Sequence, residues 1–232
     1  MADQQNDKAR YLAPGSYLDS DHPAIQAFVD ETVGDIADPT QKALKLYYTI
    51  RDGIRYHVYL DYTDPKTYRA SDCLIDKQGF CVGKAALMAA AARAAGIPAR
   101  VGYADVKNHL ASEKLRKAMG TDLFYWHGYA ELFLDGHWVK ATPAFDKALC
   151  EKFGVIALDF DGKEDSLFQP YDRNNRRHME YMNDRGTYDD VPAQEIIDDF
   201  DKYYPDLGNY AATHKGDSLH DEAGDSVADK TG

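Results

Sequence analysis

The sequence is poor in cysteine and in positive charge, and each shortage excludes a class of protein. Only three cysteines occur among 232 residues, Cys73, Cys81 and Cys150, and none forms a C-x-x-C pair. So few cysteines do not make a disulfide framework, and this spacing does not make a thiolate zinc site. With 27 basic and 39 acidic residues the net charge is −12, so nucleic acid and anionic membrane surfaces should repel the chain.

Long apolar runs are also missing. No stretch approaches the roughly 20 apolar residues of a membrane span, and the polar N-terminus has no apolar stretch of the kind found in signal peptides. We therefore expect a cytoplasmic protein that binds neither membrane nor nucleic acid. The hydrophobic content of 44% suits one domain with a substantial core, which we place at residues 13–207. Residues 1–12 and the polar, acidic 208–232 are expected to be flexible termini.

Hydrophobic spacing predicts helices in the first half of the chain and strands in the second. The predicted elements are helices over 22–33 and 38–54, an alanine-rich helix from Cys81 to about Gly96, a strand over 99–106, a short helix over 110–119, two strands over 127–142 and a helix over 192–204. Asp38 is the expected N-cap of the second helix, and Asp135-Gly136 is the strongest hairpin signal. The charged run 173–186 is interpreted as a solvated face or a rim near a cleft. Helices and antiparallel strands that are segregated along the chain indicate an α+β fold.

Cys81 lies where a helix begins, and this position favours a reactive thiol because backbone N–H dipoles stabilise a thiolate there. A thiol nucleophile needs a base, which is usually a histidine. A two-residue turn at Asp135-Gly136 pairs Tyr129 with Thr142, which makes His127 and Thr142 diagonal neighbours on one face of the sheet. If the helix packs on this sheet, Cys81 and His127 could meet. From periodicity alone that pair is a hypothesis.

Two motifs in the right order resemble those of the transglutaminase-like superfamily. The first is ASDCLIDKQGFCVGKAALMAAAARAAGIPARVGYADV at 70–106, and the second is HGYAELFLDGHWVKATPAF at 127–145. The resemblance implies a papain-like fold, in which a central nucleophile helix packs on an antiparallel sheet that carries the histidine. It further implies that Cys81 is the nucleophile and His127 the general base of acyl transfer through a thioester, without a metal or another cofactor. The substrate would then be a peptide, a protein or a small amide.

The chain departs from the superfamily pattern at one position, where Thr142 precedes Pro143 in place of the usual aspartate. A threonine hydroxyl can accept the imidazole N–H bond, but it stabilises an imidazolium less than a carboxylate does. Asp146 is an alternative orienting group. For the oxyanion we expect the backbone N–H of Cys81 as one donor and Gln78, by residue type alone, as a candidate for the other.

Three functions fit these residues. We expect hydrolysis of a peptide or amide bond first, by a cysteine protease or amidase. Transamidation, in which an amine takes the acyl group, is the alternative with the same machinery. A catalytically silent binding module with the same fold is the alternative from another class, and the uncharged Thr142 is the feature that favours it. Cys73 and Cys150 are interpreted as buried structural thiols, and Glu131 as a structural partner of an arginine or lysine.

Overall fold

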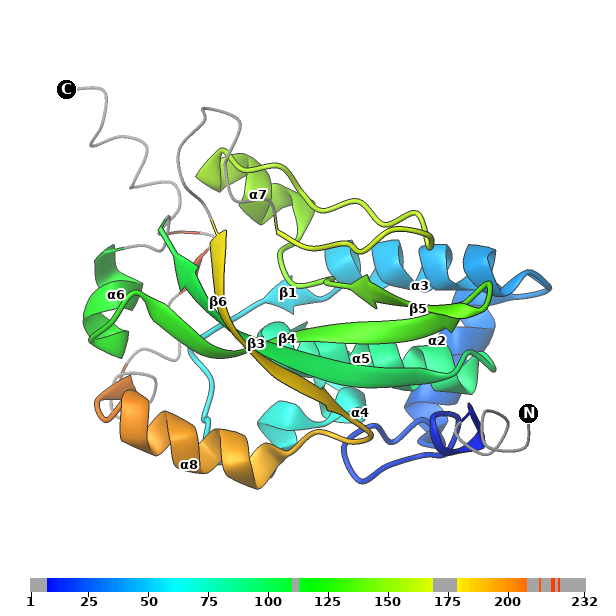
Figure 1. Cartoon of the computed structure of the whole chain (residues 1–232), viewed down its shortest axis with the longest axis horizontal. Helices are drawn as coiled ribbons and strands as arrows, with labels where there is room; N and C mark the ends of the chain where they lie inside the picture. The colour runs from blue at the N-terminus through cyan, green and yellow to red at the C-terminus, as the bar shows by residue number, and fades with distance from the viewer. Residues whose placement is uncertain are drawn as a thin grey trace.

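The computed structural model describes residues 8–109, 113–168 and 179–207, together with Thr213, Ser218, Leu219 and Asp221. Figure 1 shows the arrangement of its elements. The helices are α2 (Pro23–Val33), α3 (Pro39–Gly53), the 3-10 helix η1 (Pro65–Tyr68), α4 (Ala70–Ile75), α5 (Cys81–Ala94), α6 (Glu113–Met119), α7 (Lys147–Phe153) and α8 (Ala193–Tyr203). The strands are β1 (Arg55–Tyr56), β2 (Gln78–Gly79), β3 (Ala99–Asn108), β4 (Leu123–Leu134), β5 (His137–Ala141) and β6 (Met179–Tyr188).

The larger sheet has four antiparallel strands in the order β5-β4-β3-β6, and β1 and β2 form a separate parallel pair. In the β4–β5 hairpin Leu134 is opposite His137 and Ala130 is opposite Ala141, which confirms the predicted register. The turn residues Asp135 and Gly136 have φ of 47° and 92°. Positive φ at both positions is what a two-residue hairpin turn with right-handed twist requires.

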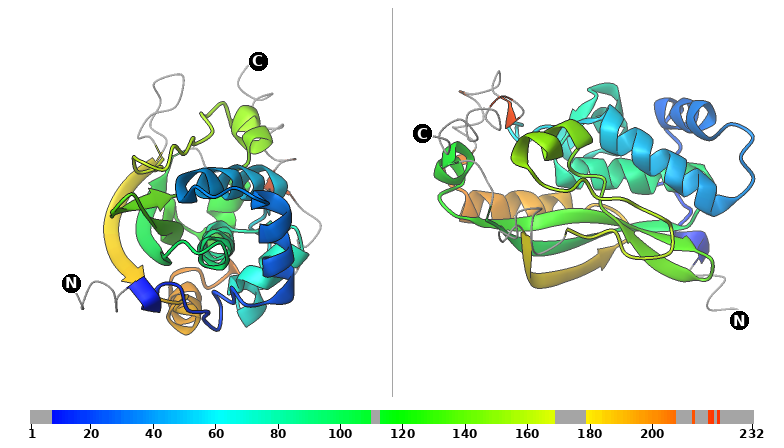
Figure 2. Two further views of the ribbon diagram at one scale, coloured as in Figure 1. Left: turned by 90° about the vertical axis from the view of Figure 1, so that its right-hand side faces the viewer. Right: turned by 90° about the horizontal axis from the view of Figure 1, so that it is seen from above.

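Helix α5 runs through the middle of the molecule. Figure 2 shows it end-on, with the sheet on one side and α2, α3 and α4 around the others. Every residue from Cys81 to Arg93 is buried. A helix enclosed on all sides carries no polar stripe, and alanine lets its neighbours approach closely. This arrangement confirms the predicted α+β architecture with a central helix packed on an antiparallel sheet.

Local signals in the sequence account for several helix ends. The Asp38 carboxylate accepts a hydrogen bond from the Gln41 N–H at 2.8 Å, which confirms the predicted N-cap of α3. Helix α8 buries Ile196 and Phe200 from one face, as its hydrophobic spacing predicts. The elements that were not predicted as such include η1, α4, β2, α7 and β6. Within the described ranges, none of the helices has the length and apolar character needed to cross a lipid bilayer.

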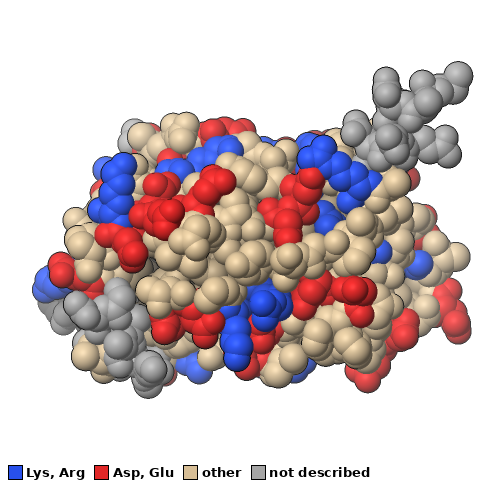
Figure 3. Space-filling model, turned by 90° about the horizontal axis from the view of Figure 1, so that it is seen from below, with Lys and Arg blue, Asp and Glu red and all other residues tan. Residues whose placement is uncertain are grey.

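The charged run 173–186 is only partly described, because 173–178 lie outside the described residues. Residues 179–186 belong to β6, an edge strand paired with β3, and most of their side chains are exposed. The prediction of a solvated face is therefore correct for residues 179–186, although their backbone forms a strand. Figure 3 shows acidic and basic side chains interspersed over the face of the molecule that lies below in Figure 1.

The predicted flexible termini are described only in part. Within 1–12, the Tyr11 ring lies edge-on to Trp138 with centroids 5.0 Å apart, and the Tyr11 carbonyl accepts from the Ala99 N–H at 2.9 Å. Residues 8–12 thus contact the body of the protein. Within 208–232, the described Ser218 hydroxyl accepts from the Arg55 guanidinium, whereas most of this segment lies outside the described residues.

Candidate active site

Cys81 is the first residue of α5, and its side chain faces the sheet and β1. The residue is 9% exposed and its thiol is free. Hydrogen-bond donors surround the sulfur, namely the backbone N–H groups of Gly128 and Val82 and the hydroxyl of Tyr56. The sulfur therefore lies between the start of its own helix, strand β4 and strand β1. Cys73 and Cys150 are also buried free thiols, as predicted.

The resting state of this sulfur is a thiol. Burial raises the pKa of Cys81 to about 11, although the N–H groups of Gly128 and Val82 and the Tyr56 hydroxyl act in the opposite direction. The helix-start effect expected from the sequence is therefore present but smaller than the cost of placing a negative charge in the protein interior. At neutral pH the sulfur needs a base to remove its proton before it can attack.

His127 lies on β4, one residue before Gly128 and opposite Ala104 of β3. A β-carbon added to Gly128 would lie 3.0 Å from the Val82 Cα and 3.2 Å from the Cys81 carbonyl oxygen. Only a residue without a side chain lets β4 approach the start of α5 this closely. The structure thus brings the Cys81 sulfur to the strand residue next to His127. His127 is 4% exposed, and its ring centroid lies 5.5 Å from that of Phe168.

The backbone of β4 is irregular immediately before His127. Trp126 has a φ of 59°, and the pairing of β3 with β4 shifts register between Ala104 and Val106. Such bulges redirect side chains and often lie beside active sites. This bulge is held from both sides, because the Trp126 N–H donates to Asp105 at 3.2 Å and the indole N–H donates to Asp199 at 2.7 Å.

Thr142 follows β5 directly and is 1% exposed. Continuing the β4–β5 register places it opposite Tyr129, as the sequence predicts. The Thr142 carbonyl accepts from the Tyr47 hydroxyl at 3.2 Å, but the Thr142 hydroxyl has no hydrogen-bond partner in the described part of the chain. An orienting bond from Thr142 to His127 is thus not formed in this conformation. The Asp146 carboxylate is the N-cap of α7 and accepts from the Leu149 N–H at 2.9 Å.

Tyr56 contacts the sulfur but was not identified as a candidate from the sequence. It lies on β1 opposite Gly79, and its hydroxyl hydrogen-bonds to the Cys81 sulfur. Burial raises the pKa of Tyr56 well above its usual value of 10.0. Gln78, the candidate from residue type, is half-buried on β2 opposite Arg55 and is not one of the donors around the sulfur named above.

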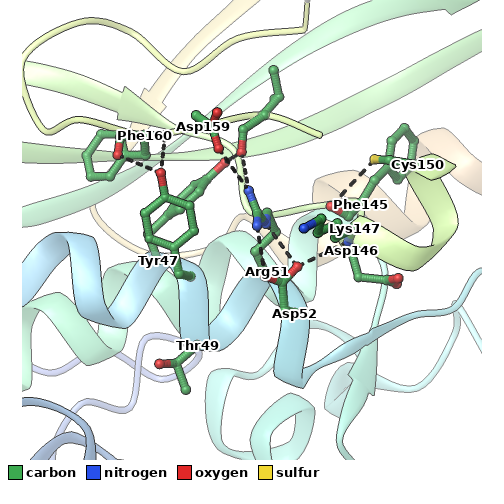
Figure 4. A network of polar contacts seen from close by, with 12 residues as sticks. Tyr47, Thr49, Arg51, Asp52, Phe145, Asp146, Lys147, Cys150, Asp159 and Phe160 are labelled. Atoms are coloured by element: carbon green, nitrogen blue, oxygen red, sulfur yellow. Dashed lines mark hydrogen bonds and ion pairs between the residues drawn. The ribbon is translucent and has the colours of Figure 1, made fainter. Parts of the chain in front are cut away.

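A polar network behind the site ties α3 to α7 and to the loop after α7 (Figure 4). The Arg51 guanidinium donates to Asp52 at 2.8 Å and to the Leu158 carbonyl at 2.7 Å. Asp52 in turn accepts from the Lys147 N–H at 3.1 Å. From α5, the buried Lys84 ammonium donates to the carbonyls of Arg51 at 3.0 Å and Ile54 at 2.6 Å. Lys84 thus links the helix of Cys81 to the residue that precedes β1.

Glu131 is engaged elsewhere, because its carboxylate forms a 2.7 Å ion pair with Arg100 of β3. This confirms the structural role predicted for it. In the described ranges, no group of three or more histidine, cysteine, aspartate or glutamate side chains is placed to hold a metal ion.

Comparison with known proteins identifies the family. A crystal structure from Cytophaga hutchinsonii, described as a candidate cysteine protease, aligns with a TM-score of 0.49 and 20% identity. The alignment covers 79% of this chain and 47% of that one, so the chain spans about half the length of the structure it matches. No curated protein matches the sequence. The sequence profile of the transglutaminase-like superfamily matches residues 26–143, which is half of the chain and includes the first motif and all but the last two residues of the second, and the protein therefore belongs to that superfamily.

Proposed function

We propose that the protein is a cysteine-dependent acyl-transfer enzyme that hydrolyses amide bonds, with Cys81 as nucleophile and His127 as general base. Membership of the superfamily supports a cysteine enzyme in general terms. The observation that carries the specific proposal is the contact of the Cys81 sulfur with the Gly128 N–H, beside His127 on the same strand. A thiol that is protonated at rest needs a base nearby, and His127 is the residue of suitable chemistry adjoining this contact.

The reaction would proceed in two halves. His127 takes the proton of the Cys81 thiol while the sulfur attacks the substrate carbonyl, and the electrons of the C=O double bond move to oxygen. The C–N bond then breaks, the amine leaves with the proton that His127 had taken, and a thioester remains on Cys81. In the second half His127 takes a proton from water, whose oxygen attacks the thioester. The acid is released, and the proton returns to sulfur.

Hydrolysis is proposed in preference to transamidation because water needs no binding site of its own, whereas an amine acceptor does. The two reactions share the first half and differ in what attacks the thioester. A peptide that contains glutamine, incubated with and without added methylamine, separates them by the product that forms at the glutamine side chain. Free carboxylate supports hydrolysis, and N-methyl amide would show transfer.

A silent binding module is the second candidate, and two observations favour it. Burial keeps the Cys81 sulfur protonated, and Thr142 offers no charge and no formed hydrogen bond to support an imidazolium. Both features would slow acyl transfer, and both would be tolerated in a protein that only binds peptides.

Acylation of Cys81 tests the proposal directly. The protein is incubated with p-nitrophenyl acetate and with peptide amides, and the adduct is located by mass spectrometry. In the wild type we expect an acetyl group to form on Cys81 and then to be hydrolysed. The same result is expected for the control variant Cys73→Ala, which removes another buried thiol. Cys81→Ala should form no such adduct, and His127→Ala should form it at least a hundred times more slowly. A wild type whose Cys81 is alkylated by iodoacetamide but never acylated would support the binding module.

A further inference from the structure

The strand of His127 carries a bulge immediately before the histidine. The pairing of β3 with β4 places two residues of β4, Tyr125 and Trp126, opposite the single residue Asp105 of β3. Trp126 has a φ of 59°, a left-handed conformation that is rare for an aromatic residue and persists only where its surroundings enforce it. Because Trp126 is bonded to His127, its backbone conformation sets the direction in which the histidine side chain leaves the strand.

A second bulge lies on the other side of β3, in β6. Gly186 and Asp184 pair with neighbouring residues of β3, which leaves Arg185 between them as the extra residue. Strand β3 separates β6 from β4, yet the Arg185 side chain reaches across it. The central guanidinium carbon lies 4.4 Å from the centroid of the Trp126 ring. The two irregular segments of the sheet therefore meet through these two side chains.

Two carboxylates join the same pair of residues, one from the sheet and one from α8. The Asp105 carboxylate accepts from the Trp126 backbone N–H at 3.2 Å and from the Arg185 Nε–H at 2.5 Å. The Asp199 carboxylate accepts from the Trp126 indole N–H at 2.7 Å and from a terminal N–H of Arg185 at 2.8 Å. Trp126 is thus held by its backbone, its indole nitrogen and the face of its ring. A guanidinium suits this place because its donors point in several fixed directions.

We propose that Arg185 is a positioning residue that acts through His127. With Asp105 and Asp199 it holds Trp126 in the left-handed conformation, and this conformation directs the imidazole towards Cys81. The inference rests on the proposed function, in which His127 takes the thiol proton. Arg185 itself exchanges no proton and contacts no reacting atom. Loss of its guanidinium therefore slows the reaction only by displacing His127, since small displacements of reacting groups are costly.

Arg185→Met, made with and without His127, tests the inference. Methionine keeps an unbranched chain over the Trp126 ring but removes the guanidinium. Acetylation of Cys81 by p-nitrophenyl acetate is measured at pH 8 in the wild type, Arg185→Met, His127→Ala and the double variant. We expect Arg185→Met to slow acetylation at least tenfold when His127 is present, and to change it less than twofold in the His127→Ala background. A residue with a merely structural role would slow acetylation in both backgrounds.

Arg100→Met is the matched control. Arg100 lies on β3 and forms a 2.7 Å ion pair with Glu131 of β4, and its side chain is 21% exposed against 17% for Arg185. Its removal therefore costs the sheet a similar ion pair without touching Trp126. Acetylation of Arg100→Met should stay within twofold of the wild-type rate. A loss as large as that in Arg185→Met would overturn the inference, because it would show a general effect of removing an ion pair from the sheet.

The folding of each variant is checked by a cooperative urea transition. Arg185→Met leaves the buried Asp105 carboxylate without its ionic partner, which can prevent folding. If no transition is seen, Asp199→Ala becomes the test, because it removes only the bonds from half-buried Asp199 of α8 and keeps the contact of Arg185 with Asp105. Acetylation should then fall several-fold with His127 present and stay unchanged in the His127→Ala background. Wild-type acetylation in Asp199→Ala would overturn the inference.

The rates also separate this inference from the proposed function. If His127→Ala is acetylated as fast as the wild type, His127 is not the base, and the proposed function and the inference both fail. If His127→Ala is slow but Arg185→Met matches the wild type, only the inference fails. Equal slowing by Arg185→Met in both backgrounds also overturns the inference, because the guanidinium would then act on the thiol or on the fold and not on His127.

Discussion

Gly128 lies against Cys81 so closely that a β-carbon on Gly128 would be 3.2 Å from the Cys81 carbonyl oxygen. The same β-carbon would lie 3.0 Å from the Val82 Cα, and both neighbours are backbone atoms at the start of α5. Backbone cannot swing aside as a flexible side chain can. Because Gly128 is bonded to His127, this contact sets how near the proposed base comes to the proposed nucleophile.

Gly128→Ala should therefore push β4 away from α5. We expect a loss of about 1–3 kcal/mol in the free energy of unfolding, because the added methyl overpacks a site with no room. We also expect acylation of Cys81 to slow by at least tenfold, because small displacements of reacting groups are costly. Urea unfolding and the acetylation rate measure the two effects. Gly53→Ala is the control, since a β-carbon there meets nothing within 4 Å. If Gly128→Ala has the same free energy of unfolding and the same acetylation rate as the wild type, the close approach of β4 to α5 does not matter for either property.

The pH dependence of Cys81 should reveal its base. Burial raises the pKa of Cys81 to about 11, so without help only about 10⁻⁴ of the thiol is ionised at pH 7. In His127→Ala, alkylation of Cys81 by iodoacetamide should rise about tenfold per pH unit from pH 7 towards pH 11. The wild type should be alkylated faster than this variant near neutrality. Labelling of the Cys81 peptide, quantified by mass spectrometry at each pH, gives both profiles. Identical profiles would remove His127 from the site.

Most of the fold follows from local signals in the sequence. The Asp38 cap, the Asp135-Gly136 turn and the alanine-rich run from Cys81 act within a few residues, and the structure has each of them. Strand β6 was missed because its side chains are mostly exposed and lack the alternation of a half-buried strand. Its backbone becomes a strand only through pairing with β3, a partner about 80 residues away in sequence that local patterns do not specify.

The candidate site was predictable only where motifs mark it. Cys81 and His127 belong to recognisable motifs, whereas Tyr56 does not, because its place depends on a two-residue parallel pairing between β1 and β2. The protonation state of the Cys81 thiol could also not be predicted from the local sequence. A helix start favours the thiolate, but burial, which is a tertiary property, has the larger effect on the pKa of Cys81.

Thr142 offers a way to test the orienting position. Its hydroxyl is buried without a hydrogen-bond partner among the described residues, so Thr142→Val should leave the free energy of unfolding unchanged or raise it by up to about 1 kcal/mol. Thr142→Asp should lower stability, because it buries a charge, and should raise acylation of Cys81 several-fold if the carboxylate reaches His127. Urea unfolding and acetylation rates are measured for both. Equal acylation in the two variants would exclude Thr142 from the orienting role.

Lys84 carries a buried ammonium, and burial lowers its pKa from 10.5 to about 8. Four groups packed around it act in the opposite direction, in order of effect Cys73, Asp146, Asp52 and Cys150. Between about pH 8 and 10.5 the folded protein therefore binds fewer protons at this site than the unfolded chain does. The contribution of Lys84 to the free energy of unfolding must then rise with pH across that window, because the unfolded state releases the proton that the folded state has already lost.

The difference in unfolding free energy between the wild type and Lys84→Met isolates this effect, since the contributions of the titrating groups that both proteins share cancel in the difference. We expect the difference to shift in favour of the wild type by up to about 3 kcal/mol as the pH rises from 8 to 10.5. Urea titrations at four or five pH values measure it. Lys45→Met on the exposed side of α3 is the matched control, and its difference from the wild type should stay flat. A flat profile for Lys84→Met as well would mean that the Lys84 ammonium is as stable inside the protein as in water.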